Sequence, residues 1–124
     1  MMGPVVLVVE DEKDLVATYE RLLRRQGCSV TAAGTLHDGL AALDTGRFAH
    51  VIADLRLPDG SGLAIVRAVR ERADGPPVIV VTGFASAESR REALDAGATA
   101  YMAKPFSALA LASLIQEVLA APPA

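Results

Sequence analysis

The sequence predicts an α/β fold: one doubly wound, five-stranded parallel sheet in the order 2-1-3-4-5, covered by five helices. Three observations predict it. Short runs rich in valine, isoleucine and alanine alternate with longer amphipathic segments along the chain. The short runs lack an apolar–polar alternation, which is typical of parallel strands buried on both faces. The chain has 124 residues, enough for one domain built from strand–helix–strand units.

Five short runs are predicted as strands, of which the last is the weakest. They are Val5–Val9, Ser29–Ala33, Val51–Asp54, Val78–Thr82 and Ala100–Ala103. Consecutive parallel strands need a right-handed crossover connection. The segments between the runs are therefore expected to form helices on both faces of the sheet.

The first two helices are predicted from apolar residues at helical spacing. In the first helix the apolar stripe is Leu15, Tyr19, Leu22 and Leu23. Gly27 is expected to end it, because glycine readily adopts the left-handed conformation found after a helix. In the second helix the apolar stripe is Leu36, Leu40 and Leu43. Thr35 is its expected N-cap, with Asp38 three residues later, and Gly46 is expected to end it.

The third and last helices follow the same spacing. The third carries Leu63, Val66 and Val69. A breaker with the sequence Asp-Gly-Pro-Pro at residues 74–77 is expected to end it. The stripe of the last helix is Leu111, Leu114, Ile115, Val118 and Leu119. Ser107 is its expected N-cap, and Phe106 is expected to pack on Leu111 as a hydrophobic staple.

The predicted fourth helix, residues 87–96, has a different pattern. Leu94 is its one large apolar residue. A helix is held mainly by its buried apolar face, so weak anchoring to the sheet is expected here. A solvated helix without further significance is the alternative interpretation.

Composition and charge exclude several classes of protein. The net charge is −3 and aromatic residues make up 4%, so neither a basic surface nor a base-stacking platform for nucleic acid is expected. The apolar run Val5–Val9 is far shorter than the roughly 20 residues of a membrane span. The single cysteine, Cys28, excludes an internal disulfide and a cysteine-based zinc site. We expect a cytoplasmic domain over residues 1–119, with a tail at 120–124 that either ends the protein or begins a linker to an output domain.

Polar residues stand at the carboxyl ends of four predicted strands, which share one edge of a parallel sheet. They are Glu10, Asp11, Asp54, Thr82 and Lys104. Neighbouring carboxylates repel each other unless a cation joins them, and their hard oxygens suit Mg²⁺. The set predicts a site where an exposed Asp54 carboxylate accepts a phosphoryl group. Thr82 would donate a hydrogen bond to this group, and Lys104 would pair with its charge.

Each of these residues also has a structural interpretation when it is taken alone. The acids at residues 10–12 would stabilise a helix N-terminus, and Asp54 would cap a loop. Thr82 would be an ordinary strand residue and Lys104 a solvated charge. The joint interpretation is favoured because all the positions fall on one edge of one sheet. The chain has ten arginines and only two lysines, which also favours a specific role for Lys104.

Four short motifs follow one another along the chain. They are Val-Val-Glu-Asp-Glu at 8–12, Ile-Ala-Asp-Leu-Arg-Leu-Pro-Asp-Gly-Ser-Gly at 52–62, Val-Val-Thr-Gly at 80–83 and Tyr-Met-Ala-Lys-Pro-Phe at 101–106. In this order and spacing they resemble the receiver domain of two-component response regulators, which has a flavodoxin-like fold. The resemblance covers about Pro4–Leu119.

The resemblance implies a magnesium site and a phosphorylation site. Glu10 and Asp11 resemble the acidic pair that holds Mg²⁺, together with Asp54 and the backbone carbonyl of Arg56. Asp54 resembles the aspartate that is phosphorylated. Many members of the family carry aspartate where Glu10 stands, so the longer Glu10 side chain is expected to reach the metal through water.

The resemblance also implies a set of switch residues. Thr82 and Lys104 match the hydroxyl and the lysine that contact the phosphoryl group. Tyr101 matches the aromatic residue that moves inward when the threonine moves. Pro105 matches the proline whose preceding peptide bond is usually cis in the family, in contrast to about 5–6% of X–Pro bonds generally.

The expected function is that of a receiver domain and not of an enzyme. A sensor histidine kinase or phosphotransfer protein would phosphorylate Asp54 in the presence of Mg²⁺. The face formed by the fourth helix, fifth strand and fifth helix would then switch to control an output domain or partner, and it would also be the surface of a homodimer. Arg56 and Phe84 flank the pocket and are expected to tune the lifetime of the phosphoryl group. Neither nucleic acid nor a membrane is expected to bind directly.

Three other functions remain open from the sequence. The first is a degenerate receiver that acts only as an interaction module. The second is a phosphatase with an aspartyl-phosphate intermediate, although Lys13 stands two residues after Asp11 where such enzymes have a second aspartate. The third is a flavodoxin-like binder, although the acids at residues 10–12 would repel its phosphate. Three further residues are interpreted as structural or solvent-facing, namely His37, His50 and Cys28. Asp59 is interpreted as serving its own turn.

Overall fold

A computed structural model describes residues 3–120 of the chain. Its elements follow the order β1 (Val5–Val9), α1 (Lys13–Arg25), β2 (Ser29–Ala33), α2 (Leu36–Thr45), β3 (His50–Ala53), β4 (Arg56–Leu57), β5 (Gly60–Ser61), α3 (Leu63–Arg70), β6 (Val78–Thr82), α4 (Ala87–Ala96), β7 (Ala100–Ala103) and α5 (Ala108–Ala120). The predicted tail begins at the last residue of α5, and its remaining residues, 121–124, lie outside the described part.

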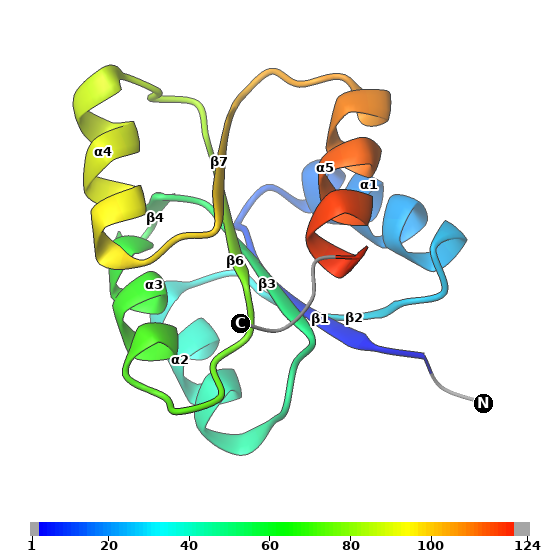
Figure 1. Cartoon of the computed structure of the whole chain (residues 1–124), viewed down its shortest axis with the longest axis horizontal. Coiled ribbons are helices and arrows are strands. Elements are labelled where there is room, and N and C mark those ends of the chain that lie inside the picture. Colours follow the sequence, from blue (N-terminus) through cyan, green and yellow to red (C-terminus); the bar gives the residue numbers. More distant parts are fainter. Residues whose placement is uncertain (1–2, 121–124) are drawn as a thin grey trace.

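Within residues 3–120, the main sheet is five-stranded and parallel, in the order β2-β1-β3-β6-β7. Numbered along the chain without the β4–β5 hairpin, these strands have the predicted order 2-1-3-4-5, so the predicted topology is confirmed. Figure 1 shows α1 and α5 on one face of the sheet and α2, α3 and α4 on the other. The winding reverses between β1 and β3. Their carboxyl ends therefore form the crevice in which doubly wound sheets bind ligands.

Two apolar layers, one on each face of the sheet, form the core. Towards α1 and α5, strand residues pack with helix residues such as Tyr19, Leu23, Leu111 and Ile115. Towards α2, α3 and α4, they pack with residues such as Leu43, Ile65, Val66 and Ala93. Consecutive residues of β1 alternate between the layers, and Val6 and Leu7 are both fully buried. The predicted burial of this strand on both faces is confirmed.

Three predicted helix ends are confirmed by their geometry. Gly27 follows α1 with a φ of 82°, in the left-handed region. The Oγ1 atom of Thr35 accepts a hydrogen bond of 3.0 Å from the backbone N–H of Asp38 at the start of α2. The Oγ atom of Ser107 accepts one of 3.0 Å from Ala110 at the start of α5. Local side-chain chemistry thus determines where these helices begin and end.

Two predicted boundaries differ from the structure. Strand β3 ends at Ala53, so Asp54 is the first residue after the strand and not its last. Helix α3 ends at Arg70, before the breaker at residues 74–77. The Phe106 ring lies in the same apolar layer as Leu111 and stacks on Tyr19, with 6.0 Å between the ring centroids.

The β4–β5 hairpin between Asp54 and α3 was not predicted. It contains two antiparallel residue pairs, and its turn consists of Pro58 and Asp59, so Asp59 lies in a turn as expected. Gly60 has a φ of 155°, which disfavours other residues there. The interpretation that Asp59 serves its own turn is incomplete, because the Asp59 carboxylate accepts hydrogen bonds from the first two N–H groups of α2. The turn brings this carboxylate to a helix N-terminus, where free N–H groups attract negative charge.

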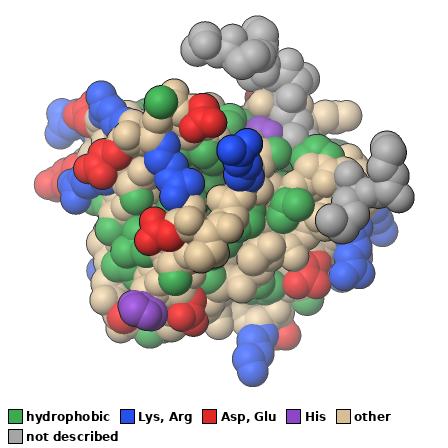
Figure 2. Space-filling view, turned by 90° about the horizontal axis from the view of Figure 1, so that it is seen from below, with side chains coloured by type: hydrophobic (Ala, Val, Ile, Leu, Met, Phe, Trp, Pro, Cys, Tyr) green, Lys and Arg blue, Asp and Glu red, His purple; other side chains and the backbone are tan. Residues whose placement is uncertain are grey.

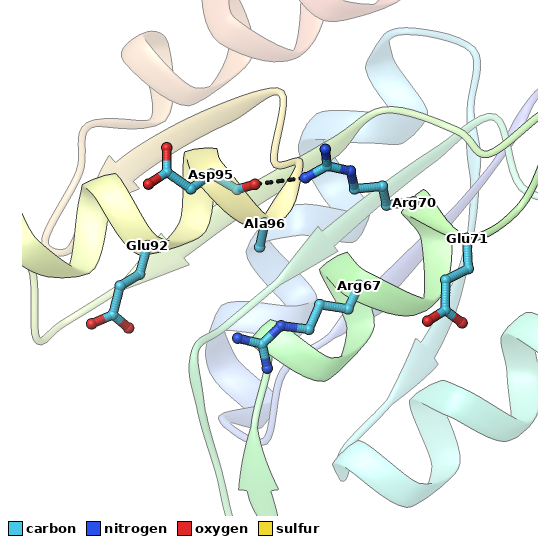
Figure 3. Close-up of a pocket in the computed structure, with 6 residues that line it drawn as sticks. All are labelled: Arg67, Arg70, Glu71, Glu92, Asp95 and Ala96. Atoms are coloured by element: carbon cyan, nitrogen blue, oxygen red, sulfur yellow. Dashed lines mark hydrogen bonds between the residues drawn. The ribbon is translucent and has the colours of Figure 1, made fainter.

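Helix α4 has little apolar contact with the rest of the fold. The expected apolar residue, Leu94, is 37% exposed, and the buried residue of the helix is Ala93. These observations agree with the predicted weak anchoring, because the one large apolar residue of the helix is exposed and its buried residue is the small Ala93. Polar contacts supplement this small apolar face. A groove of about 710 Å³ lies between α3 and α4. Across it, the Arg70 guanidinium donates a hydrogen bond of 2.6 Å to the backbone carbonyl of Asp95 (Figure 3).

The surface carries charges of both signs. On the face seen in Figure 2, basic and acidic side chains are interspersed among apolar and neutral ones. No helix within residues 3–120 has the length and hydropathy needed to cross a membrane.

Candidate functional site

The carboxyl ends of the strands bring the predicted site residues together. Glu10 and Asp11 follow β1, Asp54 follows β3, and Lys104 follows β7. Carboxylate oxygens of the three acids lie within 4.8 Å of one another. Residues separated by more than forty positions in the chain thus form one acidic cluster, as the strand order requires.

Lys104 is the cation of this cluster. Its Nζ atom lies 2.8 Å from Oδ2 of Asp54 and 2.9 Å from Oε1 of Glu10. The same atom lies 4.0 Å from Oε1 of Glu12, which the sequence analysis did not assign to the site. The run of three acids after β1 is the sequence signal that could have assigned Glu12 to the site. One ammonium group therefore faces three carboxylates.

Burial divides the acids into two kinds. Asp11 is exposed, whereas Glu10 and Asp54 are 3% and 7% exposed. The prediction of an exposed Asp54 carboxylate is therefore wrong. Lys104 covers this carboxylate, and the backbone N–H of Arg56 donates a hydrogen bond of 3.1 Å to its Oδ1 atom. Asp54 is held in place by contacts to both of its oxygens.

The protonation of the cluster follows from burial and from the ion pairs. Burial raises the pKa of the Glu10 carboxyl, although its hydrogen bonds to Lys104 and Glu12 act in the opposite direction. Burial by itself would lower the pKa of Lys104, but its hydrogen bonds to Asp54 and Glu10 outweigh this effect and raise the pKa. Lys104 is therefore an ammonium ion at neutral pH. A charged lysine partly offsets the repulsion among the buried carboxylates.

Thr82 lies at the end of β6 and is fully buried. Its Oγ1 atom accepts a hydrogen bond of 3.2 Å from the backbone N–H of Phe84. The guanidinium carbon of Arg56 lies 3.7 Å from the centre of the Phe84 ring, a cation–π contact between the start of β4 and the loop after β6. A cavity of about 460 Å³ runs beside Thr82 towards α4, lined in part by Arg56, Phe84 and Ser89.

Tyr101 and Pro105 lie on either side of Lys104 along the chain. Tyr101, on β7, is half-buried, and its hydroxyl shares a hydrogen bond of 2.7 Å with the Oγ atom of Ser89 on α4. Ser89 was not predicted to have a role, because a serine on a polar helix gives no sequence signal. The Lys104–Pro105 peptide bond is cis, as the resemblance implied.

Tyr19 is a buried polar residue close to the site that the sequence assigned only to an apolar stripe. It is 1% exposed, and within the described residues its hydroxyl has no hydrogen-bond partner. Burial raises the pKa of this phenol, and the carboxylates of Glu10, Asp54 and Glu12 raise it further. Tyr19 is therefore neutral, and its ring stacks on Phe106, two residues after Lys104.

The remaining candidates lie away from the cluster. Cys28 is buried and His37 is exposed, as their structural interpretation allows. His50 is 7% exposed at the start of β3, at the opposite end of that strand from Asp54. These three residues are not among the groups that could hold a metal ion within the described chain.

The fold and the site define a CheY-like α/β domain that carries an acidic cluster at the switch point of its sheet. A family model described as the response regulator receiver domain matches residues 6–116. The chain belongs to this family of two-component signalling domains, as its four motifs predicted.

Curated relatives and solved structures agree with this family. The chain is 36% identical to the acid tolerance regulatory protein ActR of Rhizobium meliloti over 119 residues, which are 94% of this chain and 61% of that protein. It is 39% identical to the transcriptional regulatory protein DltR of Streptococcus agalactiae over 103 residues, 83% of this chain and 46% of that protein. The chain thus spans about half to three fifths of these relatives. A CheY-like receiver domain protein from Methanospirillum hungatei superimposes with a TM-score of 0.87 at 32% identity, covering 94% of this chain and 93% of that one.

Proposed function

We propose that this receiver domain accepts a phosphoryl group on Asp54 from a sensor histidine kinase or phosphotransfer protein, in a reaction that requires Mg²⁺. The observation that carries the proposal is the position of the Asp54 carboxylate, 2.8 Å from the Lys104 ammonium and within 4.8 Å of oxygens of Glu10 and Asp11. A nucleophilic carboxylate, two further acids and a lysine form the set that phosphoryl transfer to aspartate needs.

The donor set fits Mg²⁺. Mg²⁺ prefers a few hard oxygen ligands and retains several waters, and this cluster offers carboxylate oxygens from Glu10, Asp11 and Asp54. The backbone carbonyl of Arg56 is proposed as a further ligand. Glu10 is proposed to act through water, because its Oε1 atom is engaged by Lys104 at 2.9 Å. A bound Mg²⁺ would offset negative charge on the oxygens of the transferred phosphoryl group.

The chain's own residues account for the remaining chemistry. An oxygen of Asp54 attacks phosphorus, a new O–P bond forms, and the P–N bond to the donor histidine breaks. The histidine nitrogen leaves with the bonding electron pair. Lys104 moves from the free carboxylate to the phosphoryl oxygens, and Thr82 exchanges its contact with Phe84 for a hydrogen bond to the same group.

The proposed switch runs from Thr82 to α4. A phosphoryl group adds roughly −1.5 to −2 charges and three acceptor oxygens. Movement of Thr82 towards them shifts the loop before α4 and opens space for Tyr101. Helix α4 reorients readily because its buried face consists of Ala93. The face formed by α4, β7 and α5 then changes shape and controls an output domain or partner, and it is also the proposed surface for a homodimer.

Arg56 and Phe84 are proposed to set the lifetime of the phosphoryl group. Their cation–π contact joins the start of β4 to the loop after β6, so it limits how far these two segments separate to admit water. The proposed domain spans residues 1–119 and acts in the cytoplasm with its kinase. In this proposal it does not turn over a substrate as an enzyme does.

The test is incubation with acetyl phosphate and Mg²⁺, followed by intact mass. We expect one added phosphoryl group that is removed by hydroxylamine, absent without Mg²⁺ and absent in Asp54→Asn. Asp44→Asn, which changes an exposed aspartate at the end of α2, is the matched control and is expected to be phosphorylated normally. A folded wild-type protein that takes up no phosphoryl group would favour the degenerate receiver. Steady hydrolysis of a phosphomonoester would favour the phosphatase.

A further inference from the structure

Asp59 connects the phosphoacceptor segment to a helix elsewhere in the sequence. It lies at the exposed turn of the β4–β5 hairpin, a few residues after Asp54. Its Oδ1 atom accepts a hydrogen bond of 2.7 Å from the backbone N–H of Leu36, and its Oδ2 atom accepts one of 2.9 Å from His37. Both carboxylate oxygens are therefore used at the N-terminus of α2, and these two bonds lower the pKa of Asp59.

Helix α2 has a cap of its own and does not depend on Asp59 to begin. The Oγ1 atom of Thr35 already accepts from the N–H of Asp38. Asp59 uses the two N–H groups that this local cap leaves free. The contact between the hairpin and the helix is also close, because a Cβ atom added to Gly60 would lie 2.8 Å from Cδ2 of Leu36. The hairpin turn is thus held against α2 by hydrogen bonds and by close packing.

The other end of the hairpin is fastened to Asp54. The backbone N–H of Gly62 donates a hydrogen bond of 2.9 Å to the carbonyl of Leu55, which closes the segment. A Cβ atom added to Gly62 would lie 2.0 Å from the carbonyl oxygen of Asp54, so the two backbones are in direct contact. The backbone N–H of Arg56 then bonds to the Asp54 carboxylate itself. A displacement of the turn is therefore passed to the Asp54 side chain through a short and tightly connected segment.

We propose that Asp59 is a positioning residue for phosphoryl transfer: by bonding to the N-terminus of α2, it holds the β4–β5 hairpin, and through it Arg56 and Asp54, in the reactive arrangement. This inference rests on the proposed function. Asp59 does not touch the reacting atoms and acts through the backbone. The hairpin has only two residue pairs of its own, so it needs an external anchor to keep one conformation.

The test compares two variants that each remove an acceptor from the same helix N-terminus. Asp59→Ala frees the hairpin, whereas Thr35→Ala weakens α2 and leaves the hairpin anchored. We expect Asp59→Ala to be phosphorylated by acetyl phosphate roughly tenfold more slowly than the wild type, because small misplacements of a reacting group have large effects on rate. Thr35→Ala is expected to react within about twofold of the wild type. Asp59→Asn, which retains one acceptor oxygen, is expected to restore part of the rate.

Amide hydrogen exchange gives a readout that does not depend on the reaction. The N–H groups of Arg56 and Gly62 are expected to exchange faster in Asp59→Ala and at the wild-type rate in Thr35→Ala. Equal phosphorylation rates for the two variants would overturn the inference and leave the proposed function standing. Wild-type protein that takes up no phosphoryl group would overturn both. If Asp59→Ala does not fold, Asp59→Asn carries the same comparison, and a wild-type rate together with wild-type exchange in that variant would overturn the inference.

Discussion

The ammonium group of Lys104 lies 2.8 Å from the Oδ2 atom of Asp54, although the two residues are separated by 50 positions in the chain. In this arrangement the cation covers the carboxylate that we propose to be phosphorylated. Lys104 also donates a hydrogen bond of 2.9 Å to Glu10, so one ammonium group pairs with two buried acids. The pair therefore contributes to the stability of the fold as well as to the site.

Removal of this cation is expected to destabilise the protein. In Lys104→Met, the buried carboxylates of Glu10 and Asp54 lose their partner, so the free energy of unfolding is expected to fall by about 3 kcal/mol. Because a cation is then lacking, added Mg²⁺ is expected to stabilise the variant more than it stabilises the wild type. Urea unfolding with and without Mg²⁺ measures both effects.

The chain offers one matched control for this variant. Lys13 is the other lysine and is exposed at the start of α1. Lys13→Met is expected to change the free energy of unfolding by less than about 0.5 kcal/mol, as is usual for surface substitutions. Equal losses in the two variants would contradict a structural role for the Lys104 ion pairs.

The hydrogen bond between Ser89 and Tyr101 is expected to hold α4 against β7. A double-mutant cycle with Ser89→Ala and Tyr101→Phe should give a coupling free energy of about 1 kcal/mol, the usual net contribution of one hydrogen bond. Each single variant is expected to accelerate amide exchange in α4, because the helix has a small buried face. Ser86→Ala removes the N-cap of the same helix and is expected to be additive with Tyr101→Phe. A coupling free energy near zero for Ser89 and Tyr101 would contradict the role of this bond.

His50 is expected to make stability depend on pH. Its side chain is buried, its Nδ1 atom has no partner within the described residues, and burial lowers its pKa below 6.5. Below pH 6.5 the unfolded chain binds a proton that the folded protein excludes, so the free energy of unfolding should fall as the pH decreases from 6.5. Above that pH the contribution is constant.

Urea unfolding at several pH values measures this effect. His50→Gln is expected to remove the His50 part of the pH dependence, whereas His37→Gln, at an exposed position, should leave it unchanged. An unaltered pH profile in His50→Gln would show that other groups cause the dependence.

The strands, their order and the site edge could be predicted from the sequence. Runs such as Val5–Val9 and Val78–Val81 are apolar at every position, and this pattern indicates burial on both faces. The right-handed crossover rule then limits the strand order. Residues at the carboxyl ends of these strands must meet, which is why Asp11, Asp54 and Lys104 could be grouped before their distances were known. Helix caps such as Thr35 were predictable because capping is local in the chain.

The contacts that the sequence did not reveal join residues that are neighbours only in space. Burial of Asp54 depends on where the Lys104 side chain comes to rest, and this is decided by the three carboxylates around it. Tyr101 meets Ser89 because β7 returns beside α4, and the Asp59 carboxylate reaches α2 because the short hairpin points its turn there. Periodic apolar patterns specify which face of an element is buried. Side-chain pairing across elements is decided by distances and rotamers, which arise only when the whole chain is packed.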